Sequence, residues 1–269
     1  MSPPSTVPAD PGPRLIDPAE FPRWIVEEDN DVIVLNKPGD IVCHPSKNGP
    51  WSSLVGACRE HLGLPRVHLI YRLDRETSGV MVFAKHSVMA GRLQTAVEGR
   101  RVRKFYLAIL CGELRAPVVV DAPLGRDLSS PIVARQAVVR GPEGRPALTE
   151  FIPVAQGGGY TLAQVRPRTG RQHQIRVHAA ELGCPLLGDK LYGPDQLLFL
   201  EFIKDGFTPR LAEQLILPRH ALHALEMRFD PGEGGRTFRA PLTADLRAFV
   251  LEKMGLDAAT LAAAQIAGD

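Results

Sequence analysis

The sequence predicts one α+β domain built on a mixed β-sheet, and three observations lead to that class. Segments with strand and helix patterns are interspersed without the regular βαβ alternation of a doubly wound sheet. The 269 residues, 44% apolar and 23% charged, suffice for a large core. The chain also shows no internal repeat and no long linker. We therefore expect a single catalytic or binding domain over residues 23–255.

The first half of the chain gives the following expected elements. Residues 1–22 hold seven prolines, which predicts an extended arm, poorly ordered or draped over the surface. Branched apolar residues predict strands at 32–35 and 80–85. Apolar spacing predicts a helix over 51–63 that ends at a glycine, and an amphipathic helix over 86–100.

The second half continues with strands predicted at 104–114 and 160–168, separated by a Pro- and Gly-punctuated region of short strands and loops. A helix is expected to begin near Arg171 and to end at Gly183. The stretch "RHALHALEMRFD" predicts a strand or a short helix leading into one, followed by a turn, another strand and an Ala-rich helix from Thr243. Residues 256–269 then form a helical tail.

Cysteine usage and hydropathy indicate the compartment. The four cysteines lie far apart, without a CxxC pair, and free buried thiols suit a reducing compartment. No run of 18 apolar residues exists, and the start "MSPPSTVPADPGPR" lacks the apolar core of a secretory signal. We expect a cytoplasmic protein without a membrane partner.

The net charge of +2 is unevenly distributed along the chain. Residues 66–115 carry ten bases and four acids, and residues 161–193 carry five bases and two acids. The first 50 residues carry four bases and eight acids, and residues 194–269 carry eight and eleven. Two basic segments that converge would suit a polyanion, whereas the alternative is a solvated charged face.

The stretch "YRLDRETSG" places an acid, Asp74, between two arginines and just before an apolar strand. An acid beside arginine stays ionised, which suits a nucleophile or a base. The structural alternative is a loop aspartate that caps the turn of Thr77, Ser78 and Gly79. From the local sequence alone we favour the turn-capping role.

The stretch "RTGRQHQIRVHAAELG" brings cations and backbone donors to a predicted helix N-terminus. Such a terminus can bind an anion or phosphate, with Arg171, His173 and Arg176 contributing. A metal site would need His173, His178 and Asp189 to converge, but a five-residue spacing puts the histidines about 140° apart on a helix. The histidines of "HALH" are more simply structural.

The stretch "RRVRKFYLAILCG" places Tyr106 on a strand just after Arg100, Arg101, Arg103 and Lys104. A basic rim beside an aromatic ring is what base stacking on a nucleic acid requires. The alternative, a half-buried strand tyrosine with solvated neighbours, is the commoner case for such a stretch in isolation. "GDKLYG" is a glycine-bounded turn without obligatory chemistry. No phosphate-loop, dinucleotide or serine-hydrolase motif is present, so no cofactor is implied.

Taken together, these stretches resemble the RluA family of pseudouridine synthases, whose central motif is H-R-L-D-x-x-T-S-G. The family's other blocks follow in its order as "NKPGDIVCHP", "KFYLAILCGE", "RTGRQHQIRVHAAELGCPLLGDKLYG" and "RHALHA". Tyr71 stands where the family has histidine. Residues 1–24 are too short and proline-rich for the ribosomal-protein-like RNA-binding domain of many relatives, so the chain resembles the single-domain branch.

The resemblance implies a largely antiparallel mixed sheet with flanking helices, crossed by a basic active-site cleft. It makes Asp74 the residue that breaks the uridine glycosidic bond, by attack on the anomeric carbon or by deprotonation of the neighbouring ribose carbon. Uracil is then rejoined through carbon 5. Arg176 would pair with Asp74, and Tyr106 would stack on the uracil and help remove the carbon-5 proton. Arg72 would fill the stack that the flipped uridine leaves.

The implied partner is a structured rRNA or tRNA, bound by a monomer without metal or cofactor. Beside Arg72, the expected RNA-binding residues are Arg100, Arg101, Arg103, Lys104, Arg171 and His173. Residues 126–146 and 194–218 are expected to be the loops that choose the RNA. Two rival functions stay open at this point: an inactive RNA-binding relative, and a metal-dependent hydrolase.

Overall fold

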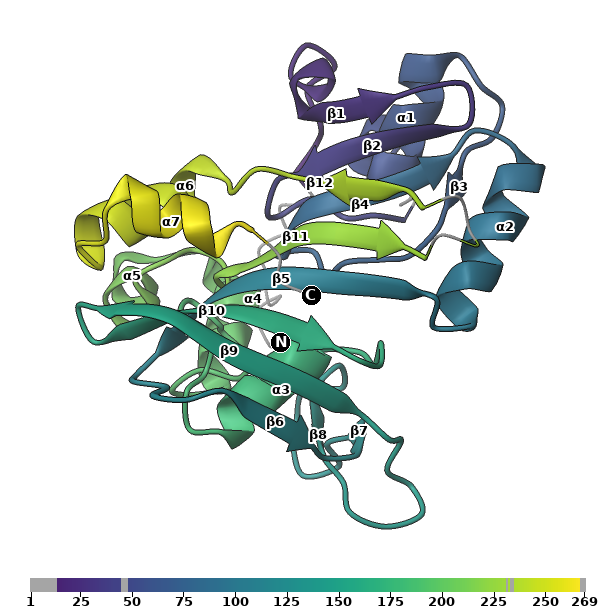
Figure 1. The fold of residues 1–269 in the computed structure, drawn as a ribbon. Coiled ribbons are helices and arrows are strands. Elements are labelled where there is room, and N and C mark those ends of the chain that lie inside the picture. Colours follow the sequence, from purple (N-terminus) through teal and green to yellow (C-terminus); the bar gives the residue numbers. More distant parts are fainter. Residues whose placement is uncertain (1–13, 45–47, 231, 233–234, 267–269) are drawn as a thin grey trace, which may run out of the picture.

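The computed structural model describes residues 14–44, 48–230, 232 and 235–266. Within them a long mixed sheet runs through the whole molecule (Figure 1). Its strands follow the spatial order β1 (Ile25–Glu28), β2 (Val32–Lys37), β4 (Ser78–Ala84), β11 (Leu222–Phe229), β5 (Val102–Cys111), β10 (Tyr160–Pro167), β9 (Leu148–Gly157) and β6 (Val118–Asp121). β12 (Thr237–Arg239) pairs with β11, and β3 (His68–Leu69) pairs with β4. β7 (Leu124–Arg126) and β8 (Gln136–Val138) form a separate hairpin.

Neighbouring strands are antiparallel except at the centre, where β4 and β11 run parallel. Ser78 and Gly79 lie opposite His223 and Ala224 in that parallel contact. Gly79 has a φ of 113°, and a Cβ there would lie 2.1 Å from the carbonyl oxygen of Ala224. Only glycine suits such a conformation at such a distance. The mixed and largely antiparallel sheet predicted from the sequence is therefore confirmed.

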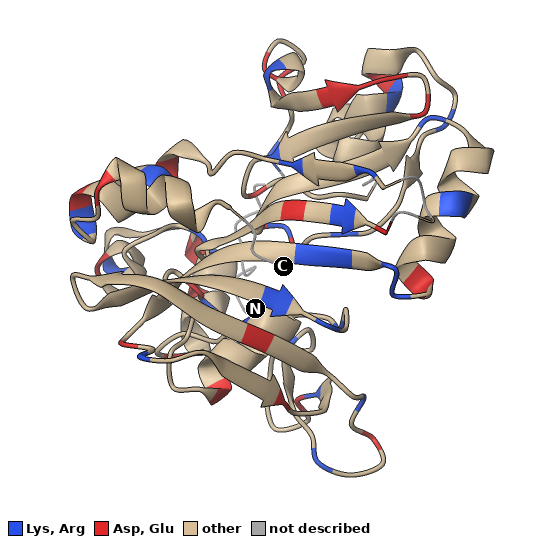
Figure 2. Ribbon diagram, viewed as in Figure 1, with Lys and Arg blue, Asp and Glu red and all other residues tan. Residues whose placement is uncertain are grey.

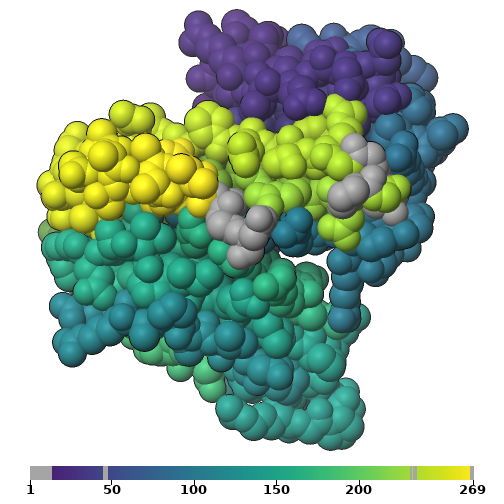
Figure 3. All heavy atoms as spheres, in the orientation of Figure 1, coloured from purple at the N-terminus to yellow at the C-terminus, as the bar shows by residue number. Residues whose placement is uncertain are grey.

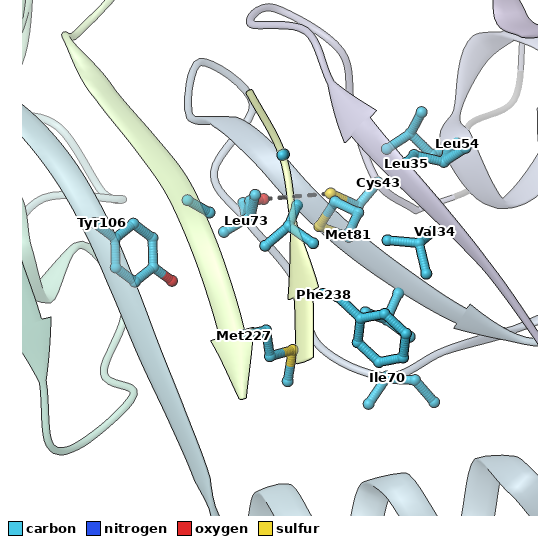
Figure 4. Close-up of a cluster of buried hydrophobic side chains, with 14 of the residues drawn as sticks. Val34, Leu35, Cys43, Leu54, Ile70, Leu73, Met81, Tyr106, Met227 and Phe238 are labelled. Carbon is cyan, nitrogen blue, oxygen red and sulfur yellow. Dashed lines mark hydrogen bonds between the residues drawn. The ribbon is translucent and has the colours of Figure 1, made fainter. Parts of the chain in front are cut away.

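Both faces of the central strands are covered. Tyr106, Ala108 and Leu110 of β5 pack in the core cluster that includes α1 (Leu54–Leu62), α2 (Ser87–Glu98) and α3 (Gln174–Glu181). Leu107 and Ile109 pack in a second cluster with α6 (Ala244–Ala248), the π-helical turn Phe249–Lys253 and α7 (Ala258–Ala264). The alternation follows from the period of two along a strand. Figure 4 shows part of the first cluster, with Tyr106 on β5 and Leu73 between that strand and Cys43.

The N-terminal segment differs in part from the expected arm. Residues 1–13 lie outside the described residues, but Ile16 and Phe21 are buried in the core. The 3-10 helix Phe21–Trp24 sets the Phe21 ring against the rings of Trp24, Trp51 and His61. The many prolines predicted an exposed arm and gave no sign that Ile16 and Phe21 are buried. Because these two residues pack in the core, the packed domain begins before residue 23.

Other boundaries also differ from expectation. Residues 194–218, expected as a loop, contain α4 (Leu197–Asp205) and α5 (Pro209–Leu215), which bury Leu198, Leu211 and Leu215 together. The helix expected from Arg171 begins at Gln174, because His173 adopts a left-handed backbone conformation. The helix expected from Thr243 is divided into α6, the π-helical turn and α7.

The two ends of the described chain pack in different core clusters, Ile16 and Phe21 in the first and Leu261 and Ala264 in the second. In Figure 3 the purple N-terminal segment lies at the top and the yellow C-terminal segment at the left, with yellow-green residues between them. Among the described residues, no helix has both the length and the apolar character needed to span a membrane.

Candidate active site

A cleft of about 1060 Å³ opens beside the strands β5, β10 and β11 and the loop that precedes β4. One wall comes from the end of α2 and the start of β5, the other from the end of β10 and its connection to α3, and the loop before β4 lies between them. Figure 2 shows Lys and Arg on β5, at the end of β10 and in these connections. The lining of the cleft has two acids, Asp74 and Glu98. It has eight bases: Arg72, Arg100, Arg103, Lys104, Arg166, Arg168, Arg171 and Arg176. This excess of positive charge suits a polyanion.

A buried lysine, Lys37, holds the backbone of the loop that carries Asp74. Nζ of Lys37 donates hydrogen bonds to the carbonyl oxygens of Pro38, Arg75 and Thr77 at 2.9, 2.7 and 2.7 Å. Burial lowers the pKa of Lys37 to about 8. The turn itself is closed by the Asp74 carbonyl, which accepts from the Thr77 N–H at 3.1 Å. The Asp74 carboxylate is thus left to face the cleft, and the main chain performs the turn closure that was the structural alternative.

Asp74 and Arg176, 102 residues apart in sequence, meet at the floor of the cleft. Nη1 of Arg176 donates to Oδ2 of Asp74 at 3.2 Å, and the two side chains are 9% and 29% exposed. Burial alone would raise the pKa of Asp74, but the charge of Arg176 and its hydrogen bond bring that pKa below its usual value. Asp74 is therefore an anion at neutral pH.

A second acid fixes the arginine. Asp189 is fully buried and accepts from Nε and Nη2 of Arg176 at 2.7 and 2.8 Å. Its Oδ1 also accepts from the backbone N–H groups of Leu191 and Tyr192 at 2.9 and 3.0 Å. Two parallel bonds to a guanidinium give geometric specificity as well as energy. Asp189 therefore orients the group that holds Asp74.

The same segment, "GDKLYG", makes two further contacts to the site. Nζ of Lys190 donates to Oε1 of Glu76 at 2.6 Å and so ties the segment to the Asp74 loop. The ring of Tyr192 lies under the Arg176 guanidinium, 4.9 Å from ring centroid to Cζ. Three residues of this stretch, for which no chemistry was expected, therefore support the pair of Asp74 and Arg176: Asp189 and Tyr192 contact Arg176, and Lys190 holds the Asp74 loop.

Tyr106 lies beside this pair in the lining of the cleft. It sits on β5, opposite Val165 of β10 and Ala224 of β11, and is 8% exposed. Burial and the charge of Asp74 raise the pKa of Tyr106 well above its usual range, so its phenol stays protonated.

Tyr71, which replaces the family's histidine, is packed under Lys104. The Lys104 ammonium lies 4.7 Å from the centroid of the Tyr71 ring, and the Tyr71 hydroxyl donates to the Val80 carbonyl. Burial lowers the pKa of Lys104 to about 8. Tyr71 is therefore held between the Lys104 ammonium and the Val80 carbonyl.

Most residues predicted for the site line this one cleft, namely Asp74, Arg176, Tyr106, Arg72, Arg100, Arg103, Lys104, Arg171 and His173. Arg101 is absent from the lining; its Nη2 donates to the Thr95 carbonyl of α2 at 3.4 Å. Sequence reasoning missed the supporting residues Lys37, Glu76, Asp189, Lys190 and Tyr192. Two features of the sequence could have indicated them. The six residues "GDKLYG" contain three charged or aromatic side chains, and a lysine ends an apolar strand.

The arrangement of the three proposed metal ligands does not form a shared site. His178 is buried and bonded to Oγ1 of Thr149 and the carbonyl of Ala122 at 2.8 and 3.0 Å. Asp189 is engaged by Arg176. Within the described part of the chain, no three His, Cys, Asp or Glu side chains are grouped as metal ligands.

The histidines of "HALH" are engaged in the core. His220 contacts Thr77 Oγ1 at 2.7 Å and lies 3.4 Å from Glu76, and His223 is bonded to Ser78 and to the Ala240 carbonyl. As the sequence suggested, these histidines are structural.

Comparisons with known proteins now identify the family. The family model for RNA pseudouridylate synthase matches residues 31–181. The chain belongs to this family. The RluA-family resemblance is confirmed by a relative from Haemophilus ducreyi, "Ribosomal large subunit pseudouridine synthase D", which is 35% identical over 235 residues. The match covers 85% of this chain and 70% of that relative. A protein with the same description from Vibrio parahaemolyticus is 36% identical over 234 residues, 84% of this chain and 69% of the relative.

Solved structures of pseudouridylate synthases have the same fold. "Human RNA Pseudouridylate Synthase Domain Containing 4" superposes with a TM-score of 0.70 at 26% identity, covering 89% of this chain and 96% of that chain. "Human RNA Pseudouridylate Synthase Domain Containing 1" gives 0.67 at 23% identity, covering 100% and 98%. The chain therefore has the pseudouridine synthase fold and belongs to a family of isomerases.

Proposed function

We propose that this pseudouridine synthase isomerises uridines of large-subunit ribosomal RNA, with Asp74 acting on the ribose. The observation that carries the proposal is an ionised carboxylate paired with a buried arginine on the floor of a basic cleft. The choice of rRNA over tRNA rests on the descriptions of the bacterial relatives.

The reaction breaks the N1–C1′ bond of uridine and forms a C5–C1′ bond, while the C5 proton is lost and N1 gains one. No oxidant, water or cofactor is consumed. Asp74 either attacks C1′ or removes a proton from C2′, and both routes need the anion that Arg176 maintains. Tyr106 stacks on the uracil. Because its phenol stays protonated in the free protein, it fits a stacking or donor role better than a base.

The basic walls are assigned to RNA binding. Arg72 is exposed at the cleft and can fill the stack from which the uridine is flipped. The guanidinium and ammonium groups of Arg100, Arg103, Lys104 and Arg171 can contact phosphates.

The test compares two variants, in each of which an aspartate is replaced by the isosteric asparagine. Asp74→Asn keeps the shape of the side chain but removes the anion, so tritium release from carbon-5-labelled uridine in ribosomal RNA should fall at least a thousandfold, on the order expected for loss of a nucleophile. RNA affinity should change less than about threefold, because Asp74 is assigned to the ribose and the phosphate contacts are assigned to the basic walls. Asp121→Asn, on an exposed strand position outside the cleft, is the matched control and should retain full activity.

Two results would contradict the proposal. Full tritium release by Asp74→Asn would remove Asp74 from the chemistry. Pseudouridine mapping of total RNA from cells with and without the gene should lose sites in large-subunit rRNA, and loss confined to tRNA would refute the proposed substrate.

A further inference from the structure

His173 has an unusual backbone conformation that directs its side chain into the cleft. It is the residue before α3, with a φ of 55°. Non-glycine residues rarely adopt this conformation, and they keep it where the surrounding structure enforces it. The ring is 11% exposed, and its Nε2 lies 3.8 Å from Oδ2 of Asp74. The imidazole is therefore aimed at the carboxylate proposed to act on the ribose.

The other ring nitrogen of His173 is held by Tyr192. Nδ1 lies 2.8 Å from the Tyr192 hydroxyl oxygen, which also accepts the backbone N–H of Gln136 at 2.8 Å. Because Gln136 donates to this oxygen, the hydroxyl proton is available for Nδ1. A neutral imidazole that accepts at Nδ1 carries its proton on Nε2. The Nε2–H bond then points toward Asp74.

The surroundings keep His173 neutral. Burial lowers the pKa of His173 to about 4, and the charge of Arg176 adds to this, while Asp74 and Asp189 oppose it. His220 is a further titratable group that affects this ring. At neutral pH the Nδ1 lone pair is therefore free to accept from Tyr192.

We propose that Tyr192 fixes the tautomer of His173, so that His173 positions Asp74 as a neutral hydrogen-bond donor. The inference rests on the proposed function, because it gives His173 a role through Asp74. His173 and Arg176 approach the same oxygen, Oδ2, which leaves Oδ1 for the ribose. The nitrogen and Oδ2 must approach to about 3 Å for a full hydrogen bond, and we expect this when the target nucleotide enters. A neutral donor orients the carboxylate without a second positive charge that would reduce its basicity.

Two substitutions of His173 separate this role from mere packing. In His173→Gln the amide nitrogen reaches the place of Nε2 and keeps a donor toward Asp74. In His173→Asn the shorter amide keeps an acceptor for Tyr192 but loses the donor toward Asp74. Asparagine tolerates positive φ better than glutamine, so a slower Asn variant cannot be explained by backbone strain.

The measurements are the single-turnover rate of pseudouridine formation and the Kd for the same RNA. We expect His173→Gln to keep the rate within about threefold and His173→Asn to lose at least about tenfold, the range for a lost hydrogen bond to a charged group. Both Kd values should stay within about threefold of the wild type. Equal rates for the two variants would overturn the inference. A loss in Kd without a loss in rate would also overturn it, in favour of a direct RNA contact.

The tautomer itself is tested without activity. Nitrogen-15 NMR of the free protein should show His173 with its proton on Nε2, its signals being assigned by their absence in His173→Asn. In Tyr192→Phe the signals should shift toward a mixture of tautomers. Tyr160→Phe, whose ring packs on Phe249 outside the cleft, is the control and should leave them unchanged. A proton on Nδ1 in the wild type would refute the proposal.

Failure of this inference differs from failure of the proposed function. If the wild type is active and Asp74→Asn is inactive, but the Gln and Asn variants of His173 behave alike, only the role of His173 is lost. If Asp74→Asn is as active as the wild type, the proposed function fails first, whatever the tautomer of His173.

Discussion

The guanidinium of Arg176 serves two carboxylates unequally. Asp189 takes two short bonds, of 2.7 and 2.8 Å, and Asp74 takes one bond of 3.2 Å. A planar fork can satisfy both acids, whereas the point charge of a lysine cannot. Arg176 is thus fixed mainly by Asp189 in the free protein, and its bond to Asp74 is the longer, single one.

Asp189→Asn should therefore damage both stability and rate. The buried Arg176 loses its main counter-charge, and breaking a buried pair costs about 3 to 5 kcal/mol in unfolding free energy. We also expect the single-turnover rate to fall at least tenfold, because Arg176 is no longer oriented. Urea unfolding and tritium release measure the two effects.

Glu226→Gln is the matched control for this variant. Glu226 is a buried acid paired with Arg228 and Arg239, away from the cleft lining. Its loss should lower stability while the rate is unchanged. Equal rates for Asp189→Asn and Glu226→Gln would contradict the positioning role of Asp189.

Glu76 gives a prediction on pH. Burial would raise the pKa of Glu76, but hydrogen bonds and charge from His220 and Lys190 lower it to about 2. A carboxyl group whose folded pKa is depressed stabilises the fold above its unfolded pKa and loses this contribution as pH falls to the folded pKa. The wild type should thus exceed Glu76→Gln by up to about 3 kcal/mol in unfolding free energy near pH 6, at 1.36 kcal/mol per pKa unit.

The measurement for Glu76 is urea unfolding at several pH values. The excess of the wild type should decline between about pH 5 and pH 2. A difference between the two proteins that stays constant across this range would show that the Glu76 charge makes no such contribution.

At the scale of elements, the parallel contact of β4 with β11 depends on Gly79. A methyl group there would meet the Ala224 carbonyl at 2.1 Å, in a backbone conformation that favours glycine. Gly79→Ala should therefore lower the unfolding free energy by at least about 2 kcal/mol. Gly91, inside α2 with open space around it, is the control, and Gly91→Ala should be neutral or stabilising by up to about 1 kcal/mol. Thermal unfolding of both variants measures these effects. Equal Tm values for Gly79→Ala and Gly91→Ala would contradict the packing argument.

The elements also show what the sequence could and could not predict. Strands β2, β4, β5 and β10 and helices α1 and α2 were predictable because their periodicity is local. Helix α3 begins late because His173 adopts a left-handed backbone conformation, which no local pattern shows. The pair of Asp74 and Arg176 followed from family motifs. Asp189 was considered only as a metal ligand, since its partner becomes visible only when the chain is folded.

At the scale of the molecule, the fold directs neighbouring charges of one basic run to different surfaces. The neighbours Arg101 and Arg103 belong to one basic run, but Arg103 lines the cleft, whereas Arg101 is directed to α2. Arg103→Gln should weaken RNA binding and reduce the slope of log affinity against log salt by up to about one unit. Arg101→Gln should leave both nearly unchanged. Filter binding over a range of salt measures this, and equal slopes would show that the whole run contacts RNA.

The monomeric state predicted from the sequence stays a prediction. Light scattering or sedimentation of the purified protein would test it, and a concentration-independent mass of about 29.3 kDa is the expected result.

The position of β11 has a consequence for the time at which the enzyme becomes competent. β11 is formed by Leu222–Phe229, yet it lies between β4 and β5, which are synthesised more than 100 residues earlier. Asp74 precedes β4, whereas Arg176 belongs to the part of the sheet beyond β5. A nascent chain that ends before β11 lacks the strand that joins these two parts of the sheet. We therefore expect the carboxylate and its arginine to meet only after β11 has left the ribosome.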